Sequence, residues 1–279
     1  MLSETEVALL IRALAAKSRQ YRDNVSLPLS EAALGLEPRA LGRGPAALKR
    51  LADRLTRPDA GLRWVLGTEA FSWRGGEGYL RVMHQAFAVV DKAPGRVAAL
   101  MTRSGAVSPI WSAFKAAAER ASPPKRLNER RTGPLIEGVV ALAREILPTS
   151  LVPWMGYSFG SPGGVERVFL RLVAIKGIGP KIASLLLGQT AWVLGLERRV
   201  SPPDRFLLQP VDIWVRRTAA ALWPDLAASQ VPSFCVARRI AETCSRIGVS
   251  GVEFNHGAWY FGSQEVKRGN LQEGLRRLL

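Results

Sequence analysis

The stretch Leu172–Ser184 reads LVAIKGIGPKIAS and contains two apolar helical patterns joined by a Gly-Ile-Gly turn. Glycine at both ends of this turn, Gly177 and Gly179, predicts positive φ or a close backbone approach that leaves no room for a Cβ atom. Pro180 suits the first position of the next helix, where its missing N–H costs nothing. The expected product is a helix start whose free amides form a site for an anion such as a phosphate group.

Apolar side chains around the turn are expected to hold the two helices together: Ile175, Ile178, Ile182 and Leu185. A Gly-x-Gly pair alone is a weak signal, but the whole pattern between two apolar helices is typical of a helix-hairpin-helix motif. Such hairpins also occur in proteins that only bind DNA without sequence preference. The hairpin alone therefore does not predict an enzyme.

A second informative stretch, Gln209–Ala219, reads QPVDIWVRRTA and places a carboxylate at the start of a helix. Taken alone, Asp212 is most simply an N-cap, because Asp accepts hydrogen bonds from the first amides and its charge is stabilised by the helix macrodipole. Only its combination with the upstream hairpin points to chemistry.

The 279-residue chain carries 39 Lys and Arg against 23 Asp and Glu, which gives a formal net charge of +16 and an isoelectric point of about 10.9. Such an excess favours a polyanionic partner, although ribosomal and membrane-surface proteins share it. The first residues read as an amphipathic helix instead of a signal peptide, and no apolar run is long enough to span a bilayer. We expect a cytoplasmic protein.

The chain is poor in metal ligands. Its two cysteines, Cys235 and Cys244, are too few for an iron–sulfur cluster. Its two histidines, His84 and His256, show no ligand spacing. We therefore expect no catalytic metal or redox cofactor, and two buried, reduced cysteines.

Almost every periodic segment has helical spacing and strand signals are scarce, so we expect an all-α fold. The expected helices that matter for the site are 4–22, 165–176, 181–193, 211–222 and 251–266. The expected loops are 34–45, 122–133, 148–164 and 195–210. We expect two lobes with a cleft between them, a central lobe of residues 45–193 ending in the hairpin and a second lobe of residues 1–44 plus 194–279.

The hairpin followed by a helix that begins Val-Asp resembles the helix-hairpin-helix DNA glycosylases, the superfamily of endonuclease III and the 8-oxoguanine glycosylases. The resemblance implies a two-lobed helical fold with Asp212 as the essential carboxylate. It also implies that Lys181 is the nucleophile of a bifunctional enzyme; a simple phosphate contact is the alternative. We expect Lys181 to be buried beside the helix start, because desolvation favours the neutral amine that can attack.

The long interval between Lys181 and Asp212 looks like that of the archaeal-type 8-oxoguanine glycosylases. The same likeness assigns base recognition to Gln20, Asn255 and Trp259, with Trp259 stacked on the extruded base. The chain departs from that family at Asn255, where the family has an acid, and in its two-glycine hairpin. Core packing is the alternative for Trp259, and an exposed helix end for Gln20.

Two aromatic residues near a glycine turn, Trp73 and Tyr79, are further candidates for the base sandwich or for filling the gap in the DNA. The function that follows is excision of 8-oxoguanine from double-stranded DNA with cleavage at the abasic site, by a monomer associated with the nucleoid. The Gly177–Gly179 turn would bind the DNA backbone and could hold a monovalent cation. The alternatives are a glycosylase for mismatched uracil or thymine or for oxidised pyrimidines, and a non-catalytic DNA-binding protein.

Overall fold

The computed structural model describes residues 2–71, 77–92, 109–121, 127–228, 230–267 and 269–279. Within these ranges the chain forms helices and turns with no β strand, which confirms the predicted all-α class for the part described. Its α-helices are α1 (Glu4–Ala16), α2 (Ser18–Tyr21), α3 (Leu27–Ala33), α4 (Pro45–Leu55), α5 (Pro58–Trp64), α6 (Glu77–Lys92), α8 (Pro109–Arg120), α9 (Glu129–Glu145), α10 (Leu151–Tyr157), α11 (Gly164–Val173), α12 (Pro180–Val193), α13 (Ile213–Leu222), α14 (Ser233–Arg246), α15 (Gly251–Tyr260) and α16 (Leu271–Arg276).

Shorter helical turns connect these elements. In the described part of the chain, π-helical turns are η1 (Arg22–Ser26), η2 (Val65–Glu69) and η7 (Phe261–Val266). The 3₁₀ turns in the same part are η3 (Ser158–Gly160), η4 (Glu197–Arg199), η5 (Pro202–Leu208) and η6 (Pro224–Leu226). None of the helices in the described ranges is long and apolar enough to cross a membrane.

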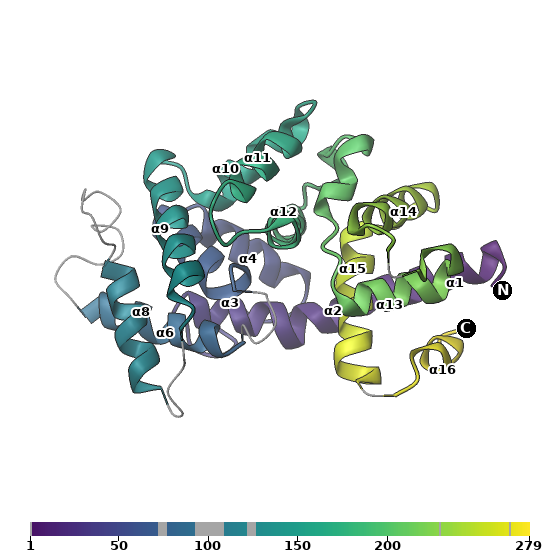
Figure 1. Cartoon of the computed structure of the whole chain (residues 1–279), viewed down its shortest axis with the longest axis horizontal. Helices are drawn as coiled ribbons and strands as arrows, with labels where there is room; N and C mark the ends of the chain where they lie inside the picture. Colours follow the sequence, from purple (N-terminus) through teal and green to yellow (C-terminus); the bar gives the residue numbers. More distant parts are fainter. Residues whose placement is uncertain (1, 72–76, 93–108, 122–126, 229, 268) are drawn as a thin grey trace.

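Among the residues that the structure describes, the buried apolar side chains form two clusters. The larger cluster takes most of its members from α3 to α12, and the smaller one packs α1 against α13, α14 and α15. Figure 1 shows the first group of helices on one side and the second on the other, with α12 and α15 between them. The chain therefore buries apolar surface, the main stabilising contribution to folding, in two separate places.

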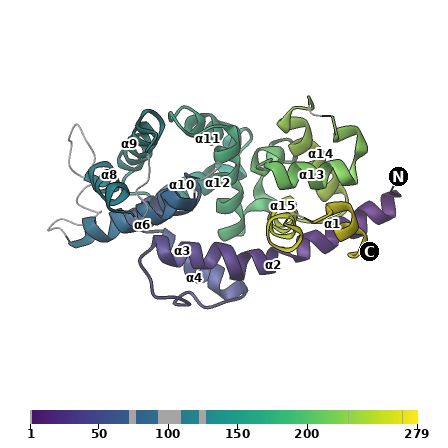
Figure 2. The same cartoon turned by 60° about the horizontal axis from the view of Figure 1, so that its bottom comes forward.

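The N-terminal helical run links the two clusters. The elements α1, α2, η1 and α3 follow one another with little interruption and pass from the smaller cluster to the larger (Figure 2). Val7 and Leu14 pack in the smaller cluster, whereas Leu27 and Leu41 pack in the larger. Residues 27–41 thus share a core with the segment that we expected to form the central lobe.

Two of the expected loops contain helices. Helix α9 begins at Glu129, inside the expected loop 122–133, and carries Pro134 in its interior. Helix α10 lies within the expected loop 148–164. In both cases burial overrides the local breakers: Leu135 and Ile136 of α9 and Leu151 and Val152 of α10 are at most 2% exposed.

The expected loop 195–210 contains η4 and η5, and a side chain from η4 orients α15. One carboxylate oxygen of Glu197, Oε1, accepts hydrogen bonds from the amides of Gly251 (2.8 Å) and Val252 (3.2 Å). The other accepts one from the Ser250 hydroxyl. Because the first amides of a helix have no intrahelical acceptor, this contact caps α15 from a distant part of the sequence.

Candidate active site

The hairpin between α11 and α12 requires glycine at its first position. Gly177 has φ +103°, a conformation that side chains of L-residues rarely adopt. A Cβ atom on Gly177 would lie 2.9 Å from the Leu135 Cβ and 3.1 Å from the Arg131 carbonyl oxygen. Both reasons that the sequence predicts for glycine, positive φ and close approach, are therefore confirmed at Gly177.

The second glycine of the hairpin is different. Gly179 has φ −91° and ψ 174°, which is extended backbone open to any residue. A Cβ atom there would meet nothing within 4 Å. The expectation that the protein's own packing demands glycine at Gly179 is wrong, because the turn has already reversed direction at Gly177. Helix α12 begins directly after it, with Pro180 in the first turn and no side-chain cap.

Ile178 joins the hairpin to the core. Its side chain is 3% exposed and its amide donates a 2.9 Å hydrogen bond to the Ile175 carbonyl. The amide of Ile178 is thus used inside the turn, so it does not add to the outward-facing donors predicted for this segment. Those donors come from the first turn of α12, whose amides have no intrahelical acceptor.

Asp212 is the N-cap of α13, as its place in the sequence predicts. Its Oδ1 accepts hydrogen bonds from the amides of Trp214 and Val215, each 2.9 Å long. The residue is partly buried, and burial raises the pKa of its carboxyl group above the usual value of 3.8. Four smaller contributions lower it again: the Val215 amide, the charge of Lys181, the Trp214 amide and the Trp259 side chain.

The charge of Lys181 acts on Asp212, so the fold brings together the two residues that the resemblance pairs. Lys181 lies in the first turn of α12 and Asp212 immediately before α13. The start of α12 therefore lies near the start of α13. The expected burial of Lys181 is wrong, because its side chain is exposed.

Trp259, near the end of α15, reaches the same place. Its side chain acts as a hydrogen-bond donor toward Asp212, the smallest of the contributions that lower the pKa of that carboxyl group. Its ring lies edge-on to Tyr21, with ring centroids 5.7 Å apart and an interplanar angle of 80°. Trp259 is partly buried and packs against the smaller core cluster. It thus borders both the Lys181–Asp212 pair and the core.

Asn255 is buried, with 3% of its surface exposed. Its Nδ2 donates to the Pro210 carbonyl (3.1 Å) and to the Gln209 Oε1 (3.4 Å). In this arrangement Asn255 fixes the segment that leads into Asp212, and its amide protons are already used by the protein. Gln20 is exposed at the end of α2, and its side chain hydrogen-bonds none of the residues that the structure describes.

A buried aromatic cluster beside the site was not predicted. Tyr21 stacks on His256 with ring centroids 4.5 Å apart, and the His256 ring meets Trp192 edge-on at 4.6 Å. The Tyr21 hydroxyl accepts a hydrogen bond from Gln189. Burial raises the pKa of Tyr21 well above its usual value, helped by the negative charge of Glu69. Burial alone lowers the pKa of His256 to about 3, so this imidazole is neutral.

A sequence signal for this cluster exists on α12. One face of the helix carries, at helical spacing, Lys181, Leu185, Gln189 and Trp192. A glutamine among apolar residues suggests a buried polar partner, here Tyr21. Of the other two aromatic candidates, Tyr79 is partly buried against the larger core cluster, where it stacks on Phe71 and Phe114. Trp73 lies outside the described residues.

The described residues hold no group of three or more His, Cys, Asp or Glu side chains arranged to bind a metal ion. Compared with models of protein families, with curated proteins and with solved structures, the chain matches none of them.

Proposed function

We propose that this protein is a DNA glycosylase that excises 8-oxoguanine and cleaves the strand at the resulting abasic site through a lysine Schiff base. One observation carries the proposal: a lysine at the start of a helix that follows a Gly-x-Gly hairpin acts electrostatically on a carboxylate that caps a second helix. An amine nucleophile next to an anion that can stabilise a sugar cation is the pairing that this reaction needs.

The proposed reaction begins with Lys181 as a neutral amine. Its Nζ attacks C1′ of the damaged nucleotide, the bond from C1′ to the base nitrogen breaks, and the base leaves with that electron pair and takes up a proton. Asp212 stabilises the positive charge that develops on the sugar and accepts or returns the proton. Ring opening gives a Schiff base on Lys181, and loss of a proton from C2′ then expels the 3′ phosphate by β-elimination.

The exposure of Lys181 in the free protein fits a nucleophile that is desolvated only when DNA arrives. A bound duplex would cover the start of α12 and remove water from the amine. Removing water disfavours the ammonium form relative to the amine. In this proposal DNA binding therefore activates Lys181, and no burial within the protein is required.

The DNA backbone would be held at the same helix start. The first amides of α12 and its macrodipole favour a phosphate group, and the open space around Gly179 lets a phosphate approach the backbone closely. The net charge of +16 favours binding to any duplex. The function proposed here requires no cofactor.

The extruded base would stack on Trp259, next to Asp212. Asn255 would hold in place the segment that leads into Asp212, through its hydrogen bond to the Pro210 carbonyl. If that segment shifts when DNA binds, the Asn255 Oδ1 would accept a hydrogen bond from the base. Gln20 would reach the base edge from the exposed end of α2. The lesion follows from the likeness to archaeal-type 8-oxoguanine glycosylases, and a cytoplasmic monomer that acts on double-stranded DNA is part of the same proposal.

The test is base release from a set of duplexes, each with one lesion: 8-oxoguanine, uracil or thymine opposite guanine, or an oxidised pyrimidine. We expect release of 8-oxoguanine by the natural protein and not by Asp212→Asn. Release of a different base only would keep the glycosylase and overturn the lesion. Duplex binding without release of any base would overturn the enzyme and leave a DNA-binding protein.

A further inference from the structure

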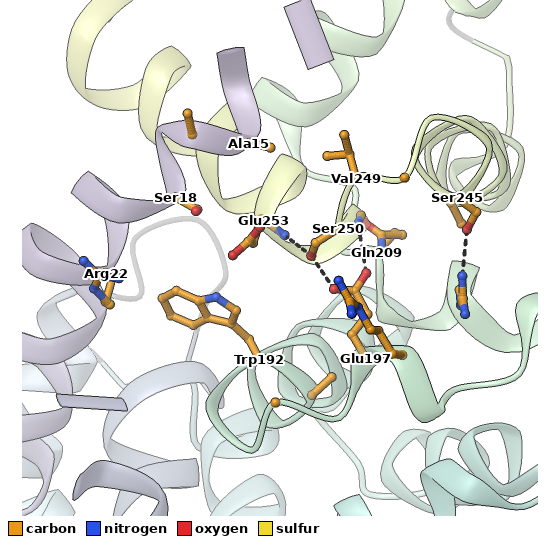
Figure 3. Close-up of a pocket in the computed structure, with 18 of the residues that line it drawn as sticks. Ala15, Ser18, Arg22, Trp192, Glu197, Gln209, Ser245, Val249, Ser250 and Glu253 are labelled. Carbon is orange, nitrogen blue, oxygen red and sulfur yellow. Dashed lines mark hydrogen bonds between the residues drawn. The ribbon is translucent and has the colours of Figure 1, made fainter. Parts of the chain in front are cut away.

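A basic cavity lies on a different part of the molecule from Lys181 and Asp212. It has a volume of about 1000 Å³ and opens among α1, α2, α12, η4, η5 and the start of α15 (Figure 3). We call it the arginine pocket, and we define it by five arginines and one tryptophan that line it: Arg12, Arg19, Arg22, Arg198, Arg205 and Trp192. Its volume is at the upper end of the range for small-molecule sites.

The arginine pocket and the proposed active site lie at opposite ends of the same two helices. Lys181 is in the first turn of α12 and Trp192 is in its last, so their positions along the axis differ by about 16 Å at 1.5 Å per residue. Likewise the pocket takes Gly251, the first residue of α15, whereas Trp259 is near its end. Neither Lys181 nor Asp212 lines the arginine pocket.

The charge balance of the pocket is positive. Besides the five arginines its lining has two carboxylates, Glu197 and Glu253. Glu197 is held by the amides and hydroxyl at the start of α15, so its charge is partly compensated there. Burial is the largest effect on Glu253 and raises the pKa of its carboxyl group, and the negative charge of Glu197 raises it further. The positive charges of Arg19 and Arg22 oppose this shift in part.

Two arginines of the pocket donate hydrogen bonds to neutral groups, which leave the positive charge of each guanidinium uncompensated. Arg12 donates to the Ile247 carbonyl (2.8 Å), and Arg205 donates to the Val200 carbonyl (3.1 Å) and the Ser245 hydroxyl (3.0 Å). Arg22 is different, because it forms an ion pair with Asp23. Arg19 and Arg198 are exposed at the pocket and can follow a ligand. Guanidinium groups match the geometry of phosphate oxygens.

Trp192 adds a flat apolar surface to this set of cations. Its ring is only partly buried, and its orientation is fixed by the edge-on contact with His256 at 68°. In Figure 3 its indole lies below Glu253 and to the right of Arg22. An aromatic ring among arginines is the combination by which proteins hold unpaired nucleotides, since the base stacks and the phosphate pairs.

We propose that the arginine pocket binds an unpaired nucleotide, with the base on Trp192 and the phosphate on Arg19 and Arg198. The nucleotide can belong to a single DNA strand or can be free, because both present the same base and phosphate. This site is separate from the proposed active site and does not depend on catalysis.

The first test measures binding of a short fluorescent oligothymidylate by anisotropy. We expect Arg19→Ala/Arg198→Ala to weaken binding by about tenfold or more, because two phosphate contacts are lost. The control Arg120→Ala/Arg276→Ala removes the same charge from exposed arginines outside the pocket and should change binding by less than about twofold. Equal weakening by both double variants would overturn the proposal. Lys181→Gln should bind normally; a loss equal to that of the pocket variant would place the ligand at the catalytic end and also overturn it.

The second test locates the base. An oligothymidylate with one 5-iodouracil is cross-linked by light to nearby aromatic residues, and the product is digested with trypsin and mapped by mass spectrometry. Trp192 is the only aromatic residue of the tryptic peptide 182–198, so a cross-link there identifies it without ambiguity. Cross-links confined to other peptides would overturn the assignment.

Competition separates the two sources of the nucleotide. A free nucleoside triphosphate that displaces the oligothymidylate indicates a site for free nucleotides, whereas failure to displace it indicates a site for a strand. Inorganic phosphate that competes as well as the nucleotide would overturn the role of Trp192. All of these measurements can succeed if base excision fails, so the two proposals can be judged separately.

Discussion

Helices α12 and α15 connect two sites that use charge in different ways. At the start of α12 and the end of α15, one lysine faces one partly buried carboxylate that also caps a helix. At the other end of both helices, five arginines surround an open cavity and only two glutamates accompany them. The first arrangement suits a reaction at a single atom, whereas the second suits recognition of an extended anion. The excess positive charge of the chain therefore contributes to both of the proposed sites.

A cluster of rings joins the two ends: Tyr21 and His256, which are buried, and Trp192, which is partly buried. Trp192 lines the arginine pocket, and Tyr21 contacts Trp259, which borders Asp212. The cluster therefore forms a continuous set of ring contacts from one site to the other. A substitution at one of the two proposed sites should leave the function of the other intact. A substitution within the ring cluster should affect both sites.

The largest effect is expected from Asp212→Asn, which removes the negative charge of the proposed catalytic carboxylate. Base excision should fall by about 10² to 10⁴, the usual contribution of a group that assists proton transfer or stabilises charge. The free energy of unfolding should stay nearly constant, because Asn is as good an N-cap as Asp. The measurements are single-turnover base release and urea unfolding. Oligothymidylate binding should not change, and excision near the natural rate would show that the carboxylate is not needed.

The exposed Asp225→Asn is the matched control for this variant. It removes one carboxylate of the same type from η6, where the side chain pairs with Arg239 at the surface. It should retain full excision. If both variants lost activity to the same extent, the effect would come from net charge and not from the position of Asp212.

His256, which is buried in the middle of α15, predicts a dependence of stability on pH. Its pKa is about 3 in the folded protein and near 6.5 when unfolded, so between these values only the unfolded chain binds the proton. Lowering the pH from 6.5 should therefore reduce the free energy of unfolding by about 1.4 kcal/mol per pH unit from this residue alone. Urea unfolding of His256→Phe should lack this contribution and have a shallower slope.

A substitution of the other histidine, His84, provides the comparison for the pH dependence of stability. Burial also lowers the pKa of His84, opposed by its hydrogen bond to the Gly67 carbonyl, so His84→Phe should remove a smaller part of the slope. A slope that is the same in the natural protein and in His256→Phe would mean that His256 is accessible to protons in the folded state.

Alanine substitutions at the two glycines of the hairpin should have different effects, one on stability and the other on duplex binding. Gly177→Ala should destabilise the protein by about 1 to 3 kcal/mol, because of its positive φ and the contacts with Leu135 and Arg131. Gly179→Ala should leave stability within about 0.5 kcal/mol and weaken duplex binding instead. Thermal unfolding and a duplex titration measure the two effects. Equal stability of the two variants would contradict the turn geometry.

The smallest effect is expected at the pocket end. Glu197→Ala removes the acceptor of the Gly251 and Val252 amides, while Ser250 still caps α15 through the Glu253 amide, and should cost about 1 kcal/mol. Glu242→Ala, at an exposed position of α14, is the control and should cost nothing measurable in urea unfolding. If the two variants were equally stable, the hydrogen bonds of Glu197 would contribute no net stability.

The sequence predicted the features that depend on neighbouring residues. The hairpin, the cap at Asp212 and most helices follow from local patterns of glycine, proline and apolar residues, and the structure confirms them. Helix α10 was missed because its stability comes from burial of Leu151 and Val152 and not from its local sequence. Features set by distant partners were not predictable either. The cap from Glu197 on α15 and the bonds of Asn255 to Pro210 and Gln209 join segments that are far apart in the chain.

Sodium borohydride trapping tests the central claim most directly, because reduction of a Schiff base links the reacting lysine to DNA permanently. With a duplex that contains 8-oxoguanine, the natural protein and Lys176→Gln, which alters an exposed lysine in the same hairpin, should both form a covalent adduct. Lys181→Gln should form none while still binding the duplex. An adduct of undiminished yield with Lys181→Gln, or base release by the natural protein without any adduct, would contradict the assignment of Lys181 as the nucleophile.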